Sequence, residues 1–186
     1  DIEGQKLRRR DPVDVVDEIE TVQRTLAPRT FEFVDSTFNL PESHALAICE
    51  EIIRRGLKVN LTTMGINPRA TSAELFALMK RAGFNSMMIT PEAGNDSMLR
   101  NLDKGFDMQD VHRTARLARA SGLHSTWFFM LGGPGETRAT VDETLAFVER
   151  ALAGPQFLSV FMTGIRMLPG TRLAAAHAAP GDDLAQ

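Results

Sequence analysis

Side chains and turns that could bind a ligand stand at the ends of short apolar runs in this sequence. They are Asp35, Thr62, Glu92, the turn Leu131-Gly132-Gly133-Pro134-Gly135-Glu136, and Arg166. Glycine lacks a Cβ and admits positive φ, so the amides of such a turn can come close to a ligand. Arg166, shortly after Gly164, is typical of an anion binder. No catalytic residue is assigned.

Each of these positions also has a purely structural interpretation. Asp35 can form an Asx turn, and Glu92 can be a solvated loop acid. Thr62 can be the β-branched filler of a strand. The glycines from Gly132 to Gly135 can simply join a strand to a helix. Both interpretations stay open as long as the positions are taken singly.

Histidine and cysteine usage argues against a metal centre and a thiol nucleophile in this chain. The four histidines, His44, His112, His124 and His177, have no metal-ligand spacing. Cys49 lies on an apolar stripe and is predicted to be a small buried hydrophobic residue. A single cysteine excludes an internal disulfide and any multi-cysteine metal site made by this chain alone.

The elements that must position the ligand-binding residues alternate along the chain. Strands are predicted over residues 30–35, 57–63, 84–90, 127–131 and 157–163, with amphipathic helices before the first and between the rest. This alternation predicts a parallel sheet with right-handed crossovers. The carboxyl ends of such strands share one edge, where ligands bind in barrels and doubly wound sheets. We therefore expect the strand-end residues to form one shared site.

Local patterns also predict helix starts and buried helix faces. A capping box is predicted for Thr71 with Glu74. A second is predicted for Thr140 with Glu143. The predicted buried faces are Ala45, Ile48, Cys49 and Ile52 on one helix, Val111, Ala115 and Ala118 on another, and Val141, Leu145, Val148 and Leu152 on the last.

Composition indicates an ordinary globular domain. The 186 residues are 43% hydrophobic and 24% charged, with a formal net charge of −3. This charge gives no reason to expect a nucleic-acid partner, and no apolar run is long enough for a membrane span. The chain also shows no secretory signal, so we expect a cytoplasmic location. One domain is predicted over residues 1–181, with a tail over 182–186.

Four segments together carry a family resemblance that extends from Ile2 to about Gly181. They are Phe31–Asn39, Thr90–Gly94 with Leu102–Gly105, Gly132–Thr137, and Gly164–Thr171. In this order they resemble the barrel of radical S-adenosylmethionine (SAM) enzymes, in the branch that carries a cobalamin-binding domain. The resemblance implies an α/β fold, a partial (β/α)6 TIM-like barrel of parallel strands. It also implies that the first strand is missing and that strands two to six are present.

The resemblance implies cofactors that this chain does not bind unaided. Relatives hold a [4Fe-4S] cluster on a Cys-x3-Cys-x2-Cys loop after the first strand, and this sequence lacks that loop. The implied set is SAM, a cluster with ligands outside this chain, and cobalamin bound by a missing N-terminal domain. The implied partners are a small-molecule substrate and an electron donor for the cluster. The isolated chain is expected to be inactive.

Family roles can be carried over to matching positions. Asp35 stands near the motif that handles the methionine amino group, and Glu92 matches an acid that contacts ribose or methionine. The stretch from Leu131 to Glu136 resembles the later part of the adenine motif, although Phe129 replaces its first glycine. The backbone around Met167 would line the adenine side.

The implied reaction is generation of a 5′-deoxyadenosyl radical for methyl transfer or for carbon-skeleton or ring chemistry. Two alternatives stay open. One is a barrel enzyme that binds a phosphorylated substrate through Gly132–Gly135 and Arg166. The other is a non-catalytic binding domain that has lost the cluster.

Overall fold

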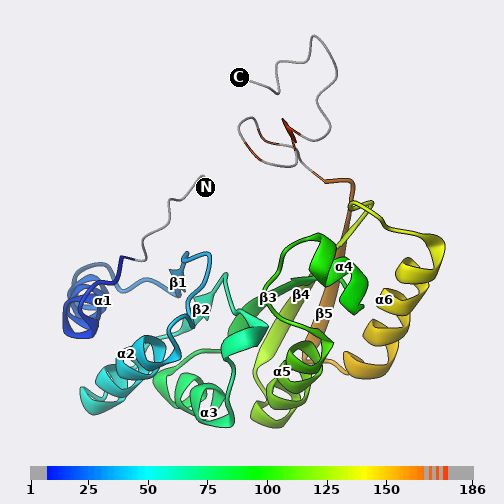
Figure 1. Ribbon diagram of the computed structural model, residues 1–186. Coiled ribbons are helices and arrows are strands. Elements are labelled where there is room, and N and C mark those ends of the chain that lie inside the picture. The colour runs from blue at the N-terminus through cyan, green and yellow to red at the C-terminus, as the bar shows by residue number, and fades with distance from the viewer. Residues whose placement is uncertain (1–7, 166–167, 169–170, 172–173, 176–186) are drawn as a thin grey trace.

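The computed structural model describes residues 8–165, 168, 171 and 174–175. Its helices are α1 (Pro12–Leu26), α2 (Glu42–Arg54), the 3-10 turn η1 (Pro68–Ala70), α3 (Ala73–Ala82), α4 (Asp96–Asn101), α5 (Met108–Ser121) and α6 (Arg138–Ala151). Its strands are β1 (Phe31–Phe33), β2 (Leu61–Thr63), β3 (Ser86–Glu92), β4 (His124–Leu131) and β5 (Phe157–Thr163). Figure 1 shows helices α1, α2, α3, α5 and α6 in an arc around the strands.

All the pairings between these strands are parallel, as the alternation predicts. β1 pairs with β2, and β3, β4 and β5 form a second sheet in that order. Isolated parallel bridges join Leu61 to Phe84 and Ile66 to Ile89, so β2 also lies beside β3. The five strands are therefore neighbours in chain order. Their carboxyl ends point to one edge, which confirms an α/β fold with parallel strands.

Two of the three predicted helix faces are buried as the 3.6-residue period requires. Ala45, Ile48, Cys49 and Ile52 of α2, and Val111, Ala115 and Ala118 of α5, are all buried. Strand β5 also has the predicted bounds. The periodic apolar stripes place these elements correctly because burial of one face is what holds a surface helix on a sheet.

Strand β4 divides its apolar run between two faces. Trp127 and Phe129 are fully buried, and both rings pack against Phe147 of α6. Phe128 and Met130 alternate with them and are only half-buried, so they point to the opposite face of the sheet. Only half of this run can therefore line a site inside the arc of strands.

Both predicted capping boxes are wrong. The N-cap of α3 is Ser72, whose hydroxyl accepts from the Leu75 amide at 3.0 Å. Thr71 is instead buried, with its hydroxyl 2.9 Å from that of Thr114. The N-cap of α6 is Thr137, which forms its box with Thr140. The actual cap of α3 lies one residue after the predicted one, and the actual cap of α6 lies three residues before it.

The predicted buried face of α6 is only partly right. Leu152 is buried and Val148 packs against the core, but Leu145 is 40% exposed, and Thr144 and Phe147 are buried instead. Two contacts set the phase of this helix: the Phe147 ring against Trp127, and the Thr144 hydroxyl, which accepts from the Gly94 amide at 3.0 Å. Tertiary packing thus overrides the apolar stripe in this helix.

Candidate active site at the strand ends

The predicted ligand-binding residues within the described ranges lie at one edge of the sheet. Glu92 and Leu131 are the last residues of β3 and β4, and the glycine turn follows β4 directly. Thr62 lies in β2, and Asp35 follows β1 by two residues. Arg166 and Met167 lie outside the described residues.

Glu92 has an unusual backbone for a strand residue. Its φ is +67°, a region that residues with a Cβ rarely occupy. The pairing of β3 with β4 is interrupted by a register shift between Ile89 and Glu92, which is a bulge that re-aims the side chain. Such local strain persists only where the surroundings impose it, and it concentrates at functional sites.

The Glu92 carboxylate forms an ion pair with Lys104. The distance from Lys104 Nζ to Glu92 Oε1 is 3.0 Å, and the two side chains are 19% and 26% exposed, respectively. This pair joins the end of β3 to the loop after α4. It is shielded from solvent more than most surface pairs, so less of its attraction is lost to screening.

The loop after Glu92 is fixed to helix α6. The Gly94 amide donates to the Thr144 hydroxyl at 3.0 Å, and a Cβ on Gly94 would lie 2.7 Å from Thr144 Cα. Asn95 Nδ2 donates to the Thr140 carbonyl oxygen at 3.1 Å, and Asn95 Oδ1 accepts from the Met98 amide as the N-cap of α4. Only glycine allows the loop to approach α6 this closely.

The glycine turn after β4 folds around its own carboxylate. Gly132 and Gly135 have φ of +92° and +76°. A carboxylate oxygen of Glu136, Oε2, accepts from the Gly132 amide. The other oxygen, Oε1, is buried and has no hydrogen-bond partner in the described part of the chain. The turn therefore offers an acceptor atom, whereas the Gly132 amide is already bonded.

Helix α4 supports this turn from one side. Asn101 Nδ2 donates to the Pro134 carbonyl oxygen at 2.9 Å. A Cβ on Gly133 would lie 3.0 Å from a methyl of Met98 and 3.4 Å from one of Leu102. The ends of β3 and β4 are thus held by the same short helix, which brings Glu92 and Glu136 onto one rigid unit.

Asp35 and Thr62 take simpler positions. Asp35 is exposed, and its carbonyl lies over Gly65, where a Cβ would come within 2.5 Å of it. Thr62 is half-buried, and its hydroxyl accepts from the Ser86 hydroxyl at 2.9 Å.

Comparison with known proteins identifies the family. Residues 2–148 match the radical SAM superfamily. This chain belongs to that superfamily. Within its fold, the strand-end residues described above occupy the edge at which ligands bind in parallel barrels.

Two relatives of this radical SAM chain are named as a methyltransferase and a cyclase. This chain is 26% identical over 171 residues to an uncharacterized methyltransferase of Pyrococcus horikoshii. The aligned region covers 91% of this chain and 36% of that protein. It is 30% identical over 141 residues to the anaerobic magnesium-protoporphyrin IX monomethyl ester cyclase of Rubrivivax gelatinosus. The aligned region covers 74% of this chain and 25% of that enzyme. The chain thus spans only 25% to 36% of the length of these relatives.

A solved radical SAM structure shows the same fold. The methyltransferase TsrM from Kitasatospora setae, with tryptophan and a SAM analogue bound, has a TM-score of 0.76 and 24% sequence identity. The similarity covers 86% of this chain and 31% of that one. A second structure of TsrM, with cobalamin and a [4Fe-4S] cluster bound, has a TM-score of 0.75.

The described residues of this radical SAM chain do not fit an iron–sulfur cluster. Among them, no group of three or more His, Cys, Asp or Glu side chains could hold a metal ion. Burial, and then the charge of Glu50, raise the pKa of the Cys49 thiol to about 12. Cys49 is therefore a core residue, as predicted, and no thiolate ligand. Across the described helices, none is long and apolar enough to cross a bilayer.

SAM itself fits better than the cluster does. The buried, unpartnered Oε1 of Glu136 is an acceptor for a ligand N–H group, and buried acceptors are rarely left unsatisfied. Glu92 supplies a second carboxylate at the neighbouring strand end.

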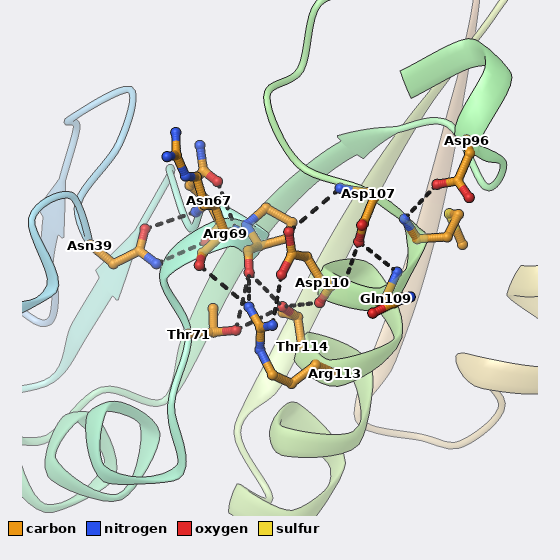
Figure 2. Close-up of polar contacts among 12 residues, drawn as sticks. Asn39, Asn67, Arg69, Thr71, Asp96, Asp107, Gln109, Asp110, Arg113 and Thr114 are labelled. Carbon is orange, nitrogen blue, oxygen red and sulfur yellow. Dashed lines mark hydrogen bonds and ion pairs between the residues drawn. The ribbon is translucent and has the colours of Figure 1, made fainter. Parts of the chain in front are cut away.

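Sequence reasoning missed a buried polar network that fixes the site loops (Figure 2). Asn39 is fully buried; its Nδ2 donates to the carbonyl oxygens of Asn67 and Ala70, and its Oδ1 accepts from the Asn67 amide at 2.8 Å. The contact between Thr71 and Thr114 then ties this loop to α5. The loops after β1 and β2 are thereby joined to each other and to α5, the helix that precedes β4.

Lys104 was also missed as a partner of Glu92. The sequence signal was present, because Leu102–Gly105 is one of the segments that carry the family resemblance. Asn39 likewise ends the first such segment. Both Lys104 and Asn39 are polar residues that lie inside a family segment and outside any apolar stripe. That combination could have identified them from the sequence.

Proposed function

We propose that this chain is the SAM-binding part of a radical SAM enzyme, with SAM held against the carboxyl ends of β3 and β4. The observation that carries the proposal is the pair of carboxylates on neighbouring strand ends. Glu92 is held in a strained backbone conformation, and Glu136 keeps a buried acceptor oxygen without a partner among the described residues. Both lie in the part of the chain that matches the superfamily.

The chemistry of these carboxylates suits SAM. Carboxylate oxygens accept hydrogen bonds from ribose hydroxyls, from the methionine ammonium and from the adenine amino group. We assign Glu92 to the ribose or methionine part and Glu136, with Leu131, Gly132 and Gly133, to adenine. Asp35, Thr62, Arg166 and Met167 complete the proposed cradle.

When bound and reductively cleaved, SAM supplies a 5′-deoxyadenosyl radical that removes a hydrogen atom from a substrate. This chain's contribution is to hold the adenosyl group and to exclude water. On the face of β4 opposite α6, Phe128 lies beside Val160 of β5, and Met130 lies beside Met162. These apolar side chains give the inner wall of the site a low-dielectric surface that suits an organic substrate.

The complete protein is proposed to carry out methyl transfer or carbon-skeleton or ring chemistry on a small organic molecule. This rests on the relatives, one a methyltransferase by name and one a ring cyclase. We further propose that β1 to β5 are strands two to six of a partial (β/α)6 barrel within residues 1–181. Cluster cysteines and a cobalamin domain would come from outside this sequence, as would contact with an electron donor.

The structure argues against a phosphate site at the glycine turn. The Gly132 amide, one of the amides of this turn that could bind a phosphate oxygen, is bonded to the Glu136 carboxylate. A second negative charge placed there would be repelled. A sugar phosphate should therefore not raise the melting temperature of the chain, whereas a SAM analogue should.

Two measurements test the proposal. Calorimetric titration should show that the 186-residue chain binds S-adenosylhomocysteine, a stable analogue of SAM. The same chain, reconstituted anaerobically with iron and sulfide, should release no 5′-deoxyadenosine from SAM, because its one cysteine cannot supply three thiolates. Failure to bind the analogue contradicts the SAM cradle, and cleavage of SAM contradicts the need for cysteines from elsewhere.

A further inference from the structure

Lys104 is held in place by more than its ion pair. Its amide donates to the Leu99 carbonyl oxygen at 3.1 Å, and its ammonium lies 5.8 Å from the centre of the Phe106 ring. The residues on either side, Asp103 and Gly105, have φ of +54° and +71°. These two left-handed residues, one on each side of Lys104, reverse the direction of the chain, so the Lys104 side chain points back toward the end of β3.

Helix α4, which precedes the loop that carries Lys104, is anchored at both ends. Asp96 Oδ1 accepts from the Met108 amide at 2.7 Å, which ties the start of α4 to α5. Asn101 Nδ2, at its end, donates to the Pro134 carbonyl oxygen of the glycine turn. Lys104 therefore projects from a rigid support, so its ammonium can fix the orientation of another side chain.

The ion pair engages one oxygen of the Glu92 carboxylate. Lys104 Nζ lies 3.0 Å from Oε1, and a carboxylate has about four lone-pair sites, so one ammonium contact leaves acceptor capacity for a ligand. Glu92 is paired with Phe129 only after the register shift and has a positive φ, so its side chain is re-aimed relative to that of a regular strand residue. The ammonium is the described contact that restricts it.

We infer that Lys104 is a positioning residue for adenosyl binding: it holds one oxygen of Glu92 so that the other accepts hydrogen bonds from the hydroxyls of the ligand. This inference rests on the proposed function, because it requires Glu92 to face the ribose. A merely structural ion pair between β3 and the loop after α4 would instead stabilise the fold and leave ligand discrimination unchanged. The two roles give different results with ligands that have or lack the hydroxyls.

The test compares two ligands in the 186-residue chain by calorimetric titration. One is S-adenosylhomocysteine, and the other is its analogue with both ribose hydroxyls replaced by hydrogen. In Lys104→Met, affinity for the first should fall about tenfold, since a hydrogen bond to a charged group is lost or misaligned. Affinity for the second should stay within about twofold. Lys104→Arg, which keeps the charge, should recover most of the loss.

Two further variants are controls. Lys80→Met removes the same charge from a lysine in the last turn of α3, which donates to the Gly122 carbonyl oxygen at 3.0 Å, and should bind both ligands as the wild type does. Glu92→Gln should reproduce the selective loss, and adding Lys104→Met to it should cost little more, because the two residues act through one contact. Melting temperatures of all variants show whether each is folded.

Every outcome decides between the roles. Unchanged affinity for S-adenosylhomocysteine in Lys104→Met overturns the positioning role. An equal loss with both ligands also overturns it, in favour of a structural ion pair. If the wild-type chain binds neither ligand, the proposed function fails, and the role of Lys104 fails with it. If the wild type binds both but Lys104→Met shows no selectivity, only the inference on Lys104 fails.

Discussion

Two ion-pair systems in this protein differ in what surrounds them. Between α1 and α2, Arg55 contacts Asp17 at 2.5 Å, Glu20 at 2.9 Å and Glu51 at 2.6 Å. All four residues lie in or at the end of helices with regular backbone. At the end of β3, Glu92 pairs with Lys104 at 3.0 Å and has a strained φ of +67°.

The difference shows which signal marks a ligand site. Hydrogen bonds from Arg54 and Arg55 lower the pKa of Glu51 from 4.5 to about 2, yet every strong contact of this group is internal to the fold. Structural ion pairs can therefore perturb a pKa as strongly as an active site does. Glu92 instead combines its ion pair with a strained backbone, and such strain concentrates at functional sites.

The largest expected effect on stability and on adenosyl binding is that of Gly94→Ala, at the loop after Glu92. A Cβ there would lie 2.7 Å from Thr144 Cα, so Gly94→Ala must push the loop away from α6. We expect a loss of about 3 kcal/mol, or a melting temperature lower by about 6 to 12 °C, together with loss of adenosyl binding. Gly56→Ala is the control: φ is +64° but nothing lies within 4 Å, so only about 1 kcal/mol should be lost.

The Arg55 cluster should affect stability and pH response without affecting the ligand. Because the pKa of Glu51 is lowered in the folded state to about 2, its contribution is present above about pH 4.5 and is lost as the pH falls toward 2. Arg55→Met should lower stability at pH 7 and reduce this acid-dependent loss. Urea unfolding at pH 7, 4.5 and 2.5 measures both. Weaker binding of S-adenosylhomocysteine by folded Arg55→Met would show that the cluster is not purely structural.

Periodic elements could be predicted from the sequence, and the contacts that make the site could not. The buried face of α2 follows from its apolar stripe, because burial of that stripe is what stabilises the helix. Glu92 and Lys104 are joined through an irregular connection with left-handed backbone at Asp103. Aspartate takes this conformation only occasionally, and no apolar period marks where it does, so periodicity alone could not place this contact.

The sequence also could not decide between two neighbouring candidates for the N-cap of α3. Thr71 and Ser72 are both good N-cap residues, and local preference barely separates them. The decision comes from Thr114, which pairs with the Thr71 hydroxyl in the interior. In contrast, the gathering of strand-end residues at one edge was predictable, because it follows from parallel topology alone.

Glu92 offers a sharper test, since strain and function should oppose each other there. Glu92→Gly removes the cost of a positive φ, about 1 kcal/mol, and loses a modest ion pair. Stability should stay the same or rise by up to about 1 kcal/mol, while affinity for S-adenosylhomocysteine falls about tenfold. Ala27→Gly relieves a φ of +44° at the end of α1 and should change stability alone. A Glu92→Gly variant that is less stable than wild type would contradict the view that Glu92 is kept for a ligand.

The smallest expected effect is at Cys49, which lies on the same helix as the Glu51 carboxylate. Burial raises the pKa of its thiol to about 12, so a disulfide reagent should label the native chain slowly and the urea-unfolded chain rapidly. Labelling then measures opening of α2. Arg55→Met should speed it, because α2 loses its ion pairs to α1, and Lys104→Met should leave it unchanged. Equal acceleration by both variants would mean that the two ion-pair systems share one stability unit, and the contrast between them would then be lost.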